Sequence, residues 1–342
     1  MNKNTYTAID IAKYISALLV VCIHTFPLYD LSPVANMAWI QCVCRIAVPF
    51  FFTVSAFLFF RKIDPKKGRK DEVNTAELKH YLRRLLYLYL TWTILYLPYT
   101  FLLWRSEGYT ITFLMRWVFD CFFNGSYYHL WFLPALMLGT LIVYTLYTSV
   151  RLKKGLCIVF ILYVIGMLMN VYGEMLAAIP YVSILYNGYM RIFTTGRNGI
   201  FFAPVFLYIG IYLKEFKGWF NKKEFLIGIG CCYGGLLVEE GLAYFSGMMQ
   251  DLTCMYLMLV PLLYFMVGAL LQVRRAPSYL TRFLRQSSLL IYVSHILFAM
   301  PLLNIFPTQH LLVYGVTILA SQVLAVVFIA LSNRFACFKI MC

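Results

Sequence analysis

Ten apolar runs, each close to 20 residues long, divide this chain of 342 residues. An α-helix of about 20 residues crosses the hydrocarbon core of a bilayer. Lipid offers no hydrogen-bond partners to an open backbone, so spanning segments must be helices or a closed barrel. Hydrophobic residues make up 62% of the chain and charged residues only 13%, which leaves too little polar surface for a water-soluble domain. The pattern predicts an all-α polytopic membrane protein, with residues 1–342 forming a single transmembrane domain.

The predicted membrane helices cover residues 9–28, 39–60, 80–103, 128–149, 155–173, 198–213, 225–246, 253–273, 287–305 and 310–332. The first run follows Lys3 and resembles the apolar part of a signal peptide. No small-residue cleavage site follows it, and the next run begins after a short loop. We therefore expect the first helix to remain in the mature protein.

Lysine and arginine are distributed unevenly between the two sides that these helices define. If the N-terminus is cytoplasmic, the inner segments hold most of the 29 Lys and Arg. The outer loops then hold only Arg105, Arg116, Arg191 and Arg197. This distribution follows the positive-inside rule, so both termini are predicted to be cytoplasmic. The same rule explains the net charge of +15, and no nucleic-acid partner is expected.

The most basic stretch is the inner loop RKIDPKKGRKDEVNTAELKHYLRR, residues 61–84. We expect its cations to orient the neighbouring helices and to attract anionic lipid headgroups. A second interpretation stays open, in which the same cations hold a phosphate-bearing ligand such as the tail of coenzyme A.

The ten cysteines lie mostly inside apolar runs, including the pairs Cys42/Cys44 and Cys231/Cys232. None of them has partners at zinc-finger spacing. We expect them to be small buried hydrophobic side chains, and we expect neither a metal site nor a disulfide framework.

Three ionisable residues interrupt the first apolar run, AIDIAKYISALLVVCIHTFPLYD. Lys13 and His24 are eleven residues apart, close to three helical turns and about 16 Å along the axis, so both point to one side. Asp10 precedes Lys13 by three residues and can neutralise it. Ionisable groups inside a bilayer are functional candidates by default. The alternatives are snorkelling of Lys13 to the inner headgroups and an interhelical hydrogen bond for His24.

The second and seventh runs also carry charged residues. Arg45 lies in the second run, with Ser55 deeper in the same run. Arginine keeps its charge, so it needs a carboxylate, carbonyl groups or an anionic ligand. Glu239 and Glu240 are adjacent in the seventh run and point about 100° apart on a helix, so we expect only one to face the bundle interior. Pairing of Arg45 with one of these glutamates and binding of a ligand stay equally open.

Two further histidines lie in predicted spans. His129 opens the fourth run at its outer end, and His295 lies in the inner half of the ninth. A lone histidine of this kind is more often a packing or hydrogen-bonding group than a catalyst. With His24 also directed into the bundle, we expect at least one of the three to contact the substrate. The predicted substrate-binding residues are Asp10, Lys13, His24, Arg45, Ser55, His129, Glu239, Glu240 and His295.

Four segments resemble motifs of the acyltransferase-3 superfamily of integral membrane proteins. DIAKYISALLVVCIH is similar to its first-helix signature, which is a basic residue, ten others and a histidine. AVPFFFTVSAFLF, HLWFLPALMLG and SLLIYVSHILF resemble its second-helix, fourth-helix and late-helix patterns. The matches run in the family's order across nearly the whole chain. The resemblance implies a ten-helix domain whose site is marked by Lys13 and His24.

Within the superfamily, the chain most resembles the membrane half of the bifunctional serine racemases of vancomycin resistance. This resemblance implies a multi-pass domain of the bacterial cytoplasmic membrane that imports L-serine for D-serine synthesis. It also implies a covalently linked cytoplasmic racemase domain, downstream of this chain in the full-length protein. Pyridoxal phosphate would belong to that racemase domain, and no cofactor is expected in this one. Membrane lipid is the other expected partner, and homodimer formation stays open.

Transport of serine would use the charged residues as a polar path. Zwitterionic serine needs a cationic contact for its carboxylate and an acceptor for its ammonium group. Arg45 with Glu239 or Glu240 is the expected pair, and His24 would line the route. No sodium-site pattern is evident, so we expect downhill movement without a coupling ion.

Two departures from the family pattern weaken the case for acyl transfer. Lys13 stands where the family has arginine and lacks its planar fork for phosphate, and Ala56 follows Ser55 where glycine is common. The alternative stays open: a membrane O-acyltransferase in which Lys13 holds cytoplasmic acyl-CoA and His24 is the catalytic general base toward a hydroxyl acceptor. A third hypothesis, a membrane anchor and oligomerisation platform, leaves the buried charges unexplained.

Overall fold

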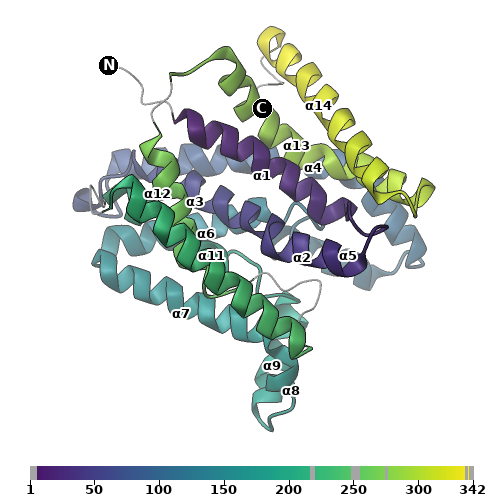
Figure 1. Cartoon of the computed structure of the whole chain (residues 1–342), viewed down its shortest axis with the longest axis horizontal. Helices are drawn as coiled ribbons and strands as arrows, with labels where there is room; N and C mark the ends of the chain where they lie inside the picture. Colours follow the sequence, from purple (N-terminus) through teal and green to yellow (C-terminus); the bar gives the residue numbers. More distant parts are fainter. Residues whose placement is uncertain (1–5, 216–219, 248–254, 274–275, 336–337, 339–342) are drawn as a thin grey trace. The chain divides into compact units, whose positions relative to one another are not determined.

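A computed structural model describes residues 6–215, 220–247, 255–273, 276–335 and 338 (Figure 1). All regular structure in these ranges is helical, which confirms the predicted all-α class. The helices are α1 (Thr7–Thr25), α2 (Pro33–Cys42), η1 (Cys44–Ile46), α3 (Ala47–Phe60), η2 (Pro65–Lys67), α4 (Glu72–Ser106), α5 (Ile111–Phe123), α6 (Phe132–Ser149), α7 (Leu152–Val171), α8 (Gly173–Ala177), α9 (Val182–Phe193), α10 (Ala203–Glu215), α11 (Lys222–Phe245), α12 (Leu259–Gln272), α13 (Tyr279–Ile305) and α14 (His310–Arg334).

Within the described ranges, eight segments are long and apolar enough to cross a membrane, which makes the protein polytopic. They are α1, the α2–α3 segment Pro33–Phe60, α4, α6, α7, α11, α13 and α14. The other two predicted spans correspond to α10 and α12, which have 13 and 14 residues. The count of ten therefore stays a prediction. Five cations counted at the predicted inner face, Lys3, Lys217, Arg274, Arg275 and Lys339, lie outside the described residues.

α10 is shorter than the predicted span 198–213 because a polar turn precedes it. The Asn198 side chain accepts hydrogen bonds from the backbone N–H groups of Ile200 (2.9 Å) and Phe201 (3.0 Å). Asn198 is itself buried, so it holds the chain in a turn and the helix begins only at Ala203.

α4 and α13 begin well before the predicted spans, each after a residue that caps it. The Asp71 side chain accepts from the backbone N–H of Asn74 and starts α4 at Glu72. Ser278 and Thr281 form a reciprocal capping box, which starts α13 at Tyr279. Charged first turns were counted as loop in the sequence, although their capping residues mark helix starts.

The chain divides into two compact units. Unit 1 comprises residues 1–51, 220–231 and 262–342, and unit 2 comprises residues 52–219 and 232–261. In unit 1, α1 packs along α13, and α13 packs along α14 (Figure 1). α1 and α13 run parallel, because Thr7 bonds to Ala276 near their starts and the rings of His24 and His295 meet further along.

Unit 2 is organised around α6, α7 and α10, which pack against one another, with α4 and α5 against α6. Its core is aromatic: the rings of Phe52 and Phe132 lie 4.5 Å apart, and Phe202, Phe206 and Tyr163 form a connected group. Aromatic pairs at such separations stabilise a core beyond the area they bury.

Gly210 lets α10 approach the backbone of α3 within unit 2. A Cβ atom at this position would overlap the carbonyl oxygen of Thr53 and would lie 2.7 Å from the backbone nitrogen of Phe57. Backbone atoms cannot rotate away as a side-chain tip can, so the two helices would have to separate. Small residues allow close helix packing in membrane proteins.

Gly210→Ala is expected to lower the stability of the protein by about 1–3 kcal/mol, because it overpacks the contact between α10 and α3. Gly315→Ala is the matched control, since nothing lies within 4 Å of a Cβ atom there. Alanine is the better helix former, so Gly315→Ala should be neutral or slightly stabilising. Thermal unfolding of the purified variants in detergent measures both. Equal midpoints for the two variants would contradict the close approach.

Candidate functional site

α1 places three candidate residues on one helix. Asp10 lies in its first turn and His24 in its last, which suits the polarity of the helix dipole at both ends. Lys13 and His24 are partly exposed, whereas Ala17 and Val21 between them are fully buried. The apolar residues fix α1 in unit 1, and the polar groups stand at either end of that packed segment.

The last turn of α1 meets α13 through two imidazoles. The ring centres of His24 and His295 lie 5.2 Å apart, with the ring planes inclined by 32°. His295 is fully buried, and His24 is partly exposed. The structure therefore brings together two of the histidines that the sequence singled out.

His295 has a defined tautomer. Its Nδ1 lies 2.7 Å from the carbonyl oxygen of Tyr292 and 3.1 Å from that of Ile291. Carbonyl oxygens only accept hydrogen bonds, so Nδ1 must carry the proton. In the neutral ring, the basic lone pair is then on Nε2. The backbone of α13 thus orients this histidine with its basic atom on the other edge.

The first part of α1 carries an ionic contact. Asp10 is buried and lies 3.9 Å from Arg285 on α13, and it also interacts electrostatically with Lys13. Arg285 is about half exposed, so this ion pair contributes little to stability. Asp10 therefore interacts with two cations. One is Lys13, as the sequence predicts, and the other is Arg285, which the sequence interpretation treated as a loop residue.

A glutamine bridges three helices between these two ends. Tyr14 on α1 donates to the side-chain oxygen of Gln322 on α14 (2.9 Å). The Gln322 amide group donates to the hydroxyl of Ser287 on α13 (3.1 Å). Polar side chains that bond across helices hold membrane bundles together, at about 1 kcal/mol each. α1, α13 and α14 are therefore joined at mid-length by hydrogen bonds as well as by apolar packing.

The start of α14 is hydrogen-bonded to the end of α1 and to the loop that follows it. The backbone N–H of His310 donates to Asp30 (2.6 Å), and its Nδ1 donates to the carbonyl oxygen of Thr25 (2.9 Å). Asp30 thus supplies an acceptor and a negative charge at the start of α14.

Arg45 lies on η1, beside the apolar contact between η1 and α1. Cys22 and Cys44 belong to one buried cluster there, with Tyr314 packed against it. The guanidinium Nε of Arg45 donates to the side-chain oxygen of Gln41 (3.3 Å), and Gln41 is buried. Arg45 is partly exposed, and the partner of its Nε, the side chain of Gln41, is neutral.

Ser55 and His129 belong to unit 2, and each has an aromatic neighbourhood. A side-chain hydrogen bond joins Ser55 to Tyr81 on α4. His129 is almost fully buried, and its ring lies 4.9 Å from that of Tyr96 and 5.9 Å from that of Tyr127. This packing is the environment expected of a structural histidine. The substrate-binding role of both residues stays a prediction.

The two adjacent glutamates of α11 differ in burial, as expected for neighbours that point in different directions on a helix. Glu240 is buried, at 2% exposure, and Glu239 is partly exposed. The carboxylate of Glu239 accepts hydrogen bonds from the backbone N–H groups of Leu257 (2.8 Å) and Met258 (3.1 Å). Glu239 therefore caps the segment that leads into α12, a structural use that its sequence position did not indicate.

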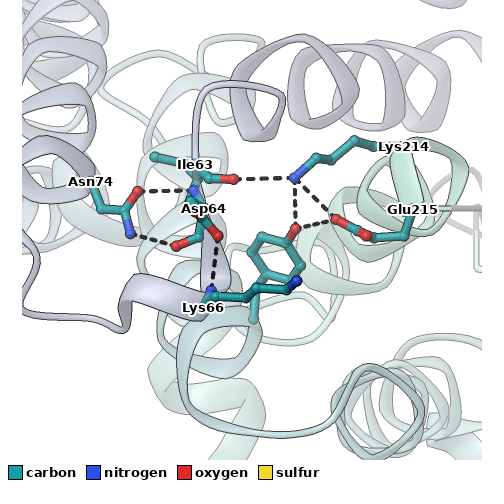
Figure 2. Close-up of polar contacts among 7 residues, drawn as sticks. Ile63, Asp64, Lys66, Asn74, Lys214 and Glu215 are labelled. Carbon is teal, nitrogen blue, oxygen red and sulfur yellow. Dashed lines mark hydrogen bonds and ion pairs between the residues drawn. The ribbon is translucent and has the colours of Figure 1, made fainter.

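The basic loop before α4 is folded by bonds to its backbone (Figure 2). Asn74 is buried, accepts from the Asp64 N–H (3.0 Å), and donates to the carbonyl oxygens of Asp64 (2.8 Å) and Gly68 (3.2 Å). Tyr144 on α6 donates to the carbonyl oxygen of Arg69 (2.8 Å). The loop is held from several sides while its cationic side chains stay outside.

Lys214 at the end of α10 anchors the same loop (Figure 2). Its ammonium group donates to the carbonyl oxygen of Ile63 (3.1 Å) and to the hydroxyl of Tyr147 (2.7 Å), and it pairs with Glu215 (3.0 Å). The Tyr147 hydroxyl donates in turn to Glu215. The exposed cations that this arrangement presents are Arg61, Lys62, Lys66, Lys67, Arg69 and Lys70.

Unit 1 contains Asp10, Lys13, His24, Arg45 and His295, and the other predicted residues belong to unit 2. Sequence reasoning missed Arg285, Tyr14 and Gln322 as members of the polar contacts. For Arg285, the signal was the capping pair Ser278 and Thr281, which starts α13 early enough to include it. The Gln322 bridge had no sequence signal, because it depends on the packing of three helices. Across the described residues, no group of three or more His, Cys, Asp or Glu could hold a metal ion.

The chain is similar to one protein family and to several bacterial racemases. The family model for an acyltransferase domain of the acyltransferase-3 type matches residues 6–332. An amino-acid racemase of Enterococcus faecalis is 31% identical over 277 residues, which cover 80% of this chain and 37% of the racemase. A serine/alanine racemase of Enterococcus gallinarum is 28% identical over 288 residues, which cover 84% of this chain and 40% of the racemase. The chain thus matches less than half the length of these relatives. No solved structure matches.

Glu239→Ala is expected to lower stability by about 1–3 kcal/mol, because two backbone N–H groups lose a charged acceptor. Glu77→Ala is the control, since Glu77 pairs with Lys62 at the surface. Such exposed pairs contribute about 1 kcal/mol or less. Thermal unfolding in detergent compares the two. A fall no larger than that of the control would show that the Glu239 cap is unimportant and would restore Glu239 as a ligand candidate.

Proposed function

Because the chain belongs to the acyltransferase-3 family of integral membrane proteins, we propose that it is a membrane domain that imports L-serine. In this proposal the domain lies in the bacterial cytoplasmic membrane and supplies serine for conversion to D-serine, as vancomycin resistance requires. The domain itself would be a transporter with an acyltransferase-3 fold, and racemisation would take place elsewhere in the full-length protein.

The observation that carries this proposal is the pattern of similarity to racemases. The matched segments cover 80% and 84% of this chain but only 37% and 40% of the two racemases. Such partial coverage fits a membrane half joined to a separate racemase domain. A serine/alanine racemase works on a polar zwitterion, which does not cross lipid unaided, so a membrane half that admits this substrate gives the linkage a purpose.

The residues of unit 1 support recognition of an amino acid. A serine carboxylate would be held by the guanidinium group of Arg45, which Gln41 directs. His24 would line the route beside His295. The ammonium group needs a carboxylate acceptor; of the two glutamates predicted for this role, both in unit 2, Glu239 is engaged in capping. Lys13 and Asp10 would form the cytoplasmic end of the path.

The proposal includes three partners besides serine. Anionic lipid headgroups would contact the exposed cations of the loop before α4. A covalently linked cytoplasmic racemase domain would carry pyridoxal phosphate. A homodimer is compatible with both.

A second candidate function is O-acyl transfer, which membership of the family favours. His24 would act as general base, oriented by the neighbouring His295, while Lys13 and the cationic loop would hold acyl-CoA. Lysine binds phosphate as a point charge and not as a fork, which makes this donor site weaker than an arginine would.

The test is uptake of labelled L-serine into proteoliposomes that contain the purified chain. Arg45→Gln is expected to raise the KM for serine by about tenfold or more, because a charged hydrogen bond to the carboxylate is lost. Arg105→Gln, at an exposed position at the end of α4, is the matched control. His24→Ala should slow uptake in a protein that still unfolds cooperatively.

No uptake above empty vesicles, together with tight binding of acyl-CoA and transfer of its acyl group to a hydroxyl acceptor, would replace transport by the second function. If His24→Ala leaves the uptake rate unchanged, this histidine is structural.

A further inference from the structure

We propose that His24 and His295 together hold a single proton, and that this proton couples serine import to the proton gradient. The inference rests on the proposed function and adds the coupling ion. It replaces the expectation, drawn from the sequence, that serine moves downhill without an ion.

The geometry of the pair carries the first step. The ring centres lie 5.2 Å apart with the planes inclined by 32°, so the two imidazoles are in contact and a charge on one ring acts strongly on the other. Nδ1 of His295 is committed to two carbonyl oxygens, so Nε2 is the atom that takes up the proton.

The pair binds one proton and not two. Two imidazolium rings at this distance would be like charges in a buried, low-dielectric site, where their repulsion is strong. The titration thus belongs to the pair and not to either ring alone.

Other titratable groups near the pair lie on the elements packed there; they include His310, whose Nδ1 donates to the carbonyl oxygen of Thr25 beside His24, and its acceptor Asp30. Tyr292 lies on α13, with its ring 6.4 Å from that of His295, and Tyr314 lies on α14. Cys22 lies on α1, and Cys44 precedes Arg45 on η1. Histidine is the side chain that ordinarily changes charge between pH 5 and 8, so the two imidazoles are the natural carriers. The thiols of Cys22 and Cys44 are the alternative carriers, which the variant Cys22→Ala tests.

A polar seam on α13 and α14 gives the proton a route. Ser294, Thr317 and Ser321 are fully buried, and their hydroxyl oxygens have no hydrogen-bond partner among the described residues. Thr317 and Ser321 are one turn apart on α14, and Ser294 is two turns from Ser287 on α13. Buried hydroxyls of this kind are satisfied by ordered water.

The seam continues toward the cytoplasmic ends of these helices. Ser287 accepts from Gln322, which accepts from Tyr14, and Asp10 with Arg285 stands beyond them. The hydroxyls of Tyr14 and Ser287 and the carboxylate of Asp10 can accept or pass a proton, whereas Arg285 keeps its charge. In the proposed cycle one proton enters from the outside with one neutral zwitterionic serine and leaves to the cytoplasm. Each cycle therefore moves one positive charge inward.

The first experiment measures labelled L-serine in proteoliposomes with acid outside, at a difference of about 1.5 pH units, and with the membrane potential clamped. With one proton per serine, wild-type protein should concentrate serine up to about 30-fold, since each pH unit supplies a tenfold ratio. His24→Gln and His295→Asn should fail to concentrate it. The asparagine amide can still donate to the carbonyl oxygens that hold Nδ1.

Two controls accompany these variants. His80→Gln replaces an exposed histidine on α4, and Cys22→Ala removes one thiol of the buried pair. Both should still concentrate serine under the pH gradient. If Cys22→Ala abolishes concentration while His295→Asn does not, the thiols and not the imidazoles carry the proton, and the inference is overturned.

The second experiment does not depend on transport. The chain has five histidines, so selective ¹⁵N labelling gives a spectrum that single variants can assign. His24 and His295 should titrate together, with uptake of one proton, and replacement of either should remove that shared step. Independent titration of the two rings, or full protonation of both, would overturn the pair.

The two experiments separate the failures. Serine uptake that ignores the pH gradient overturns the coupling and leaves the proposed function standing. Absence of any uptake removes both the proposed function and the coupling, whereas the histidine titration still decides whether the proton pair exists.

Discussion

The parallel packing of α1 against α13 is the contact on which the rest of unit 1 depends. It pairs Asp10 with Arg285 near the start of both helices and His24 with His295 further along. Between these points Ala17, Val21 and Ile291 form a fully buried apolar contact. Because the apolar contact fixes the register, the polar groups at both ends meet without adjustments of their own. Because the two helices run parallel, polar residues along α1 meet polar residues along α13.

Polar groups at membrane depth are costly unless they are paired, and this chain pairs them in two ways. Some are used for structure: Gln322 bridges three helices, Glu239 caps a backbone turn, and Lys214 holds the basic loop. Others remain candidates for ligand binding, notably the partly exposed Arg45 and His24. Separation of these two classes leaves a small set of candidate residues in unit 1.

Local patterns predicted much of this fold. Apolar run lengths gave the helical class and most spans, and helical spacing placed Lys13 and His24 on one side of α1. The spacing could not reveal that His24 meets His295, because that contact depends on how distant helices pack. Nor could it show that α10 begins late, since a side chain, Asn198, competes with the helix for backbone N–H groups. Contacts between side chains and distant segments or backbone groups thus determine these two features, and the sequence pattern alone does not reveal them.

The most direct measurement of the central claim is cysteine cross-linking in native membranes, in a background without other cysteines. His24→Cys combined with His295→Cys should form a disulfide readily on mild oxidation. His24→Cys combined with Ser288→Cys should not, because Ser288 lies two turns, about 10 Å, further back along α13. Cross-linking of the first pair alone would establish the parallel register of α1 and α13. Cross-linking of the second pair, or of neither, would contradict it and remove the basis for a shared histidine site.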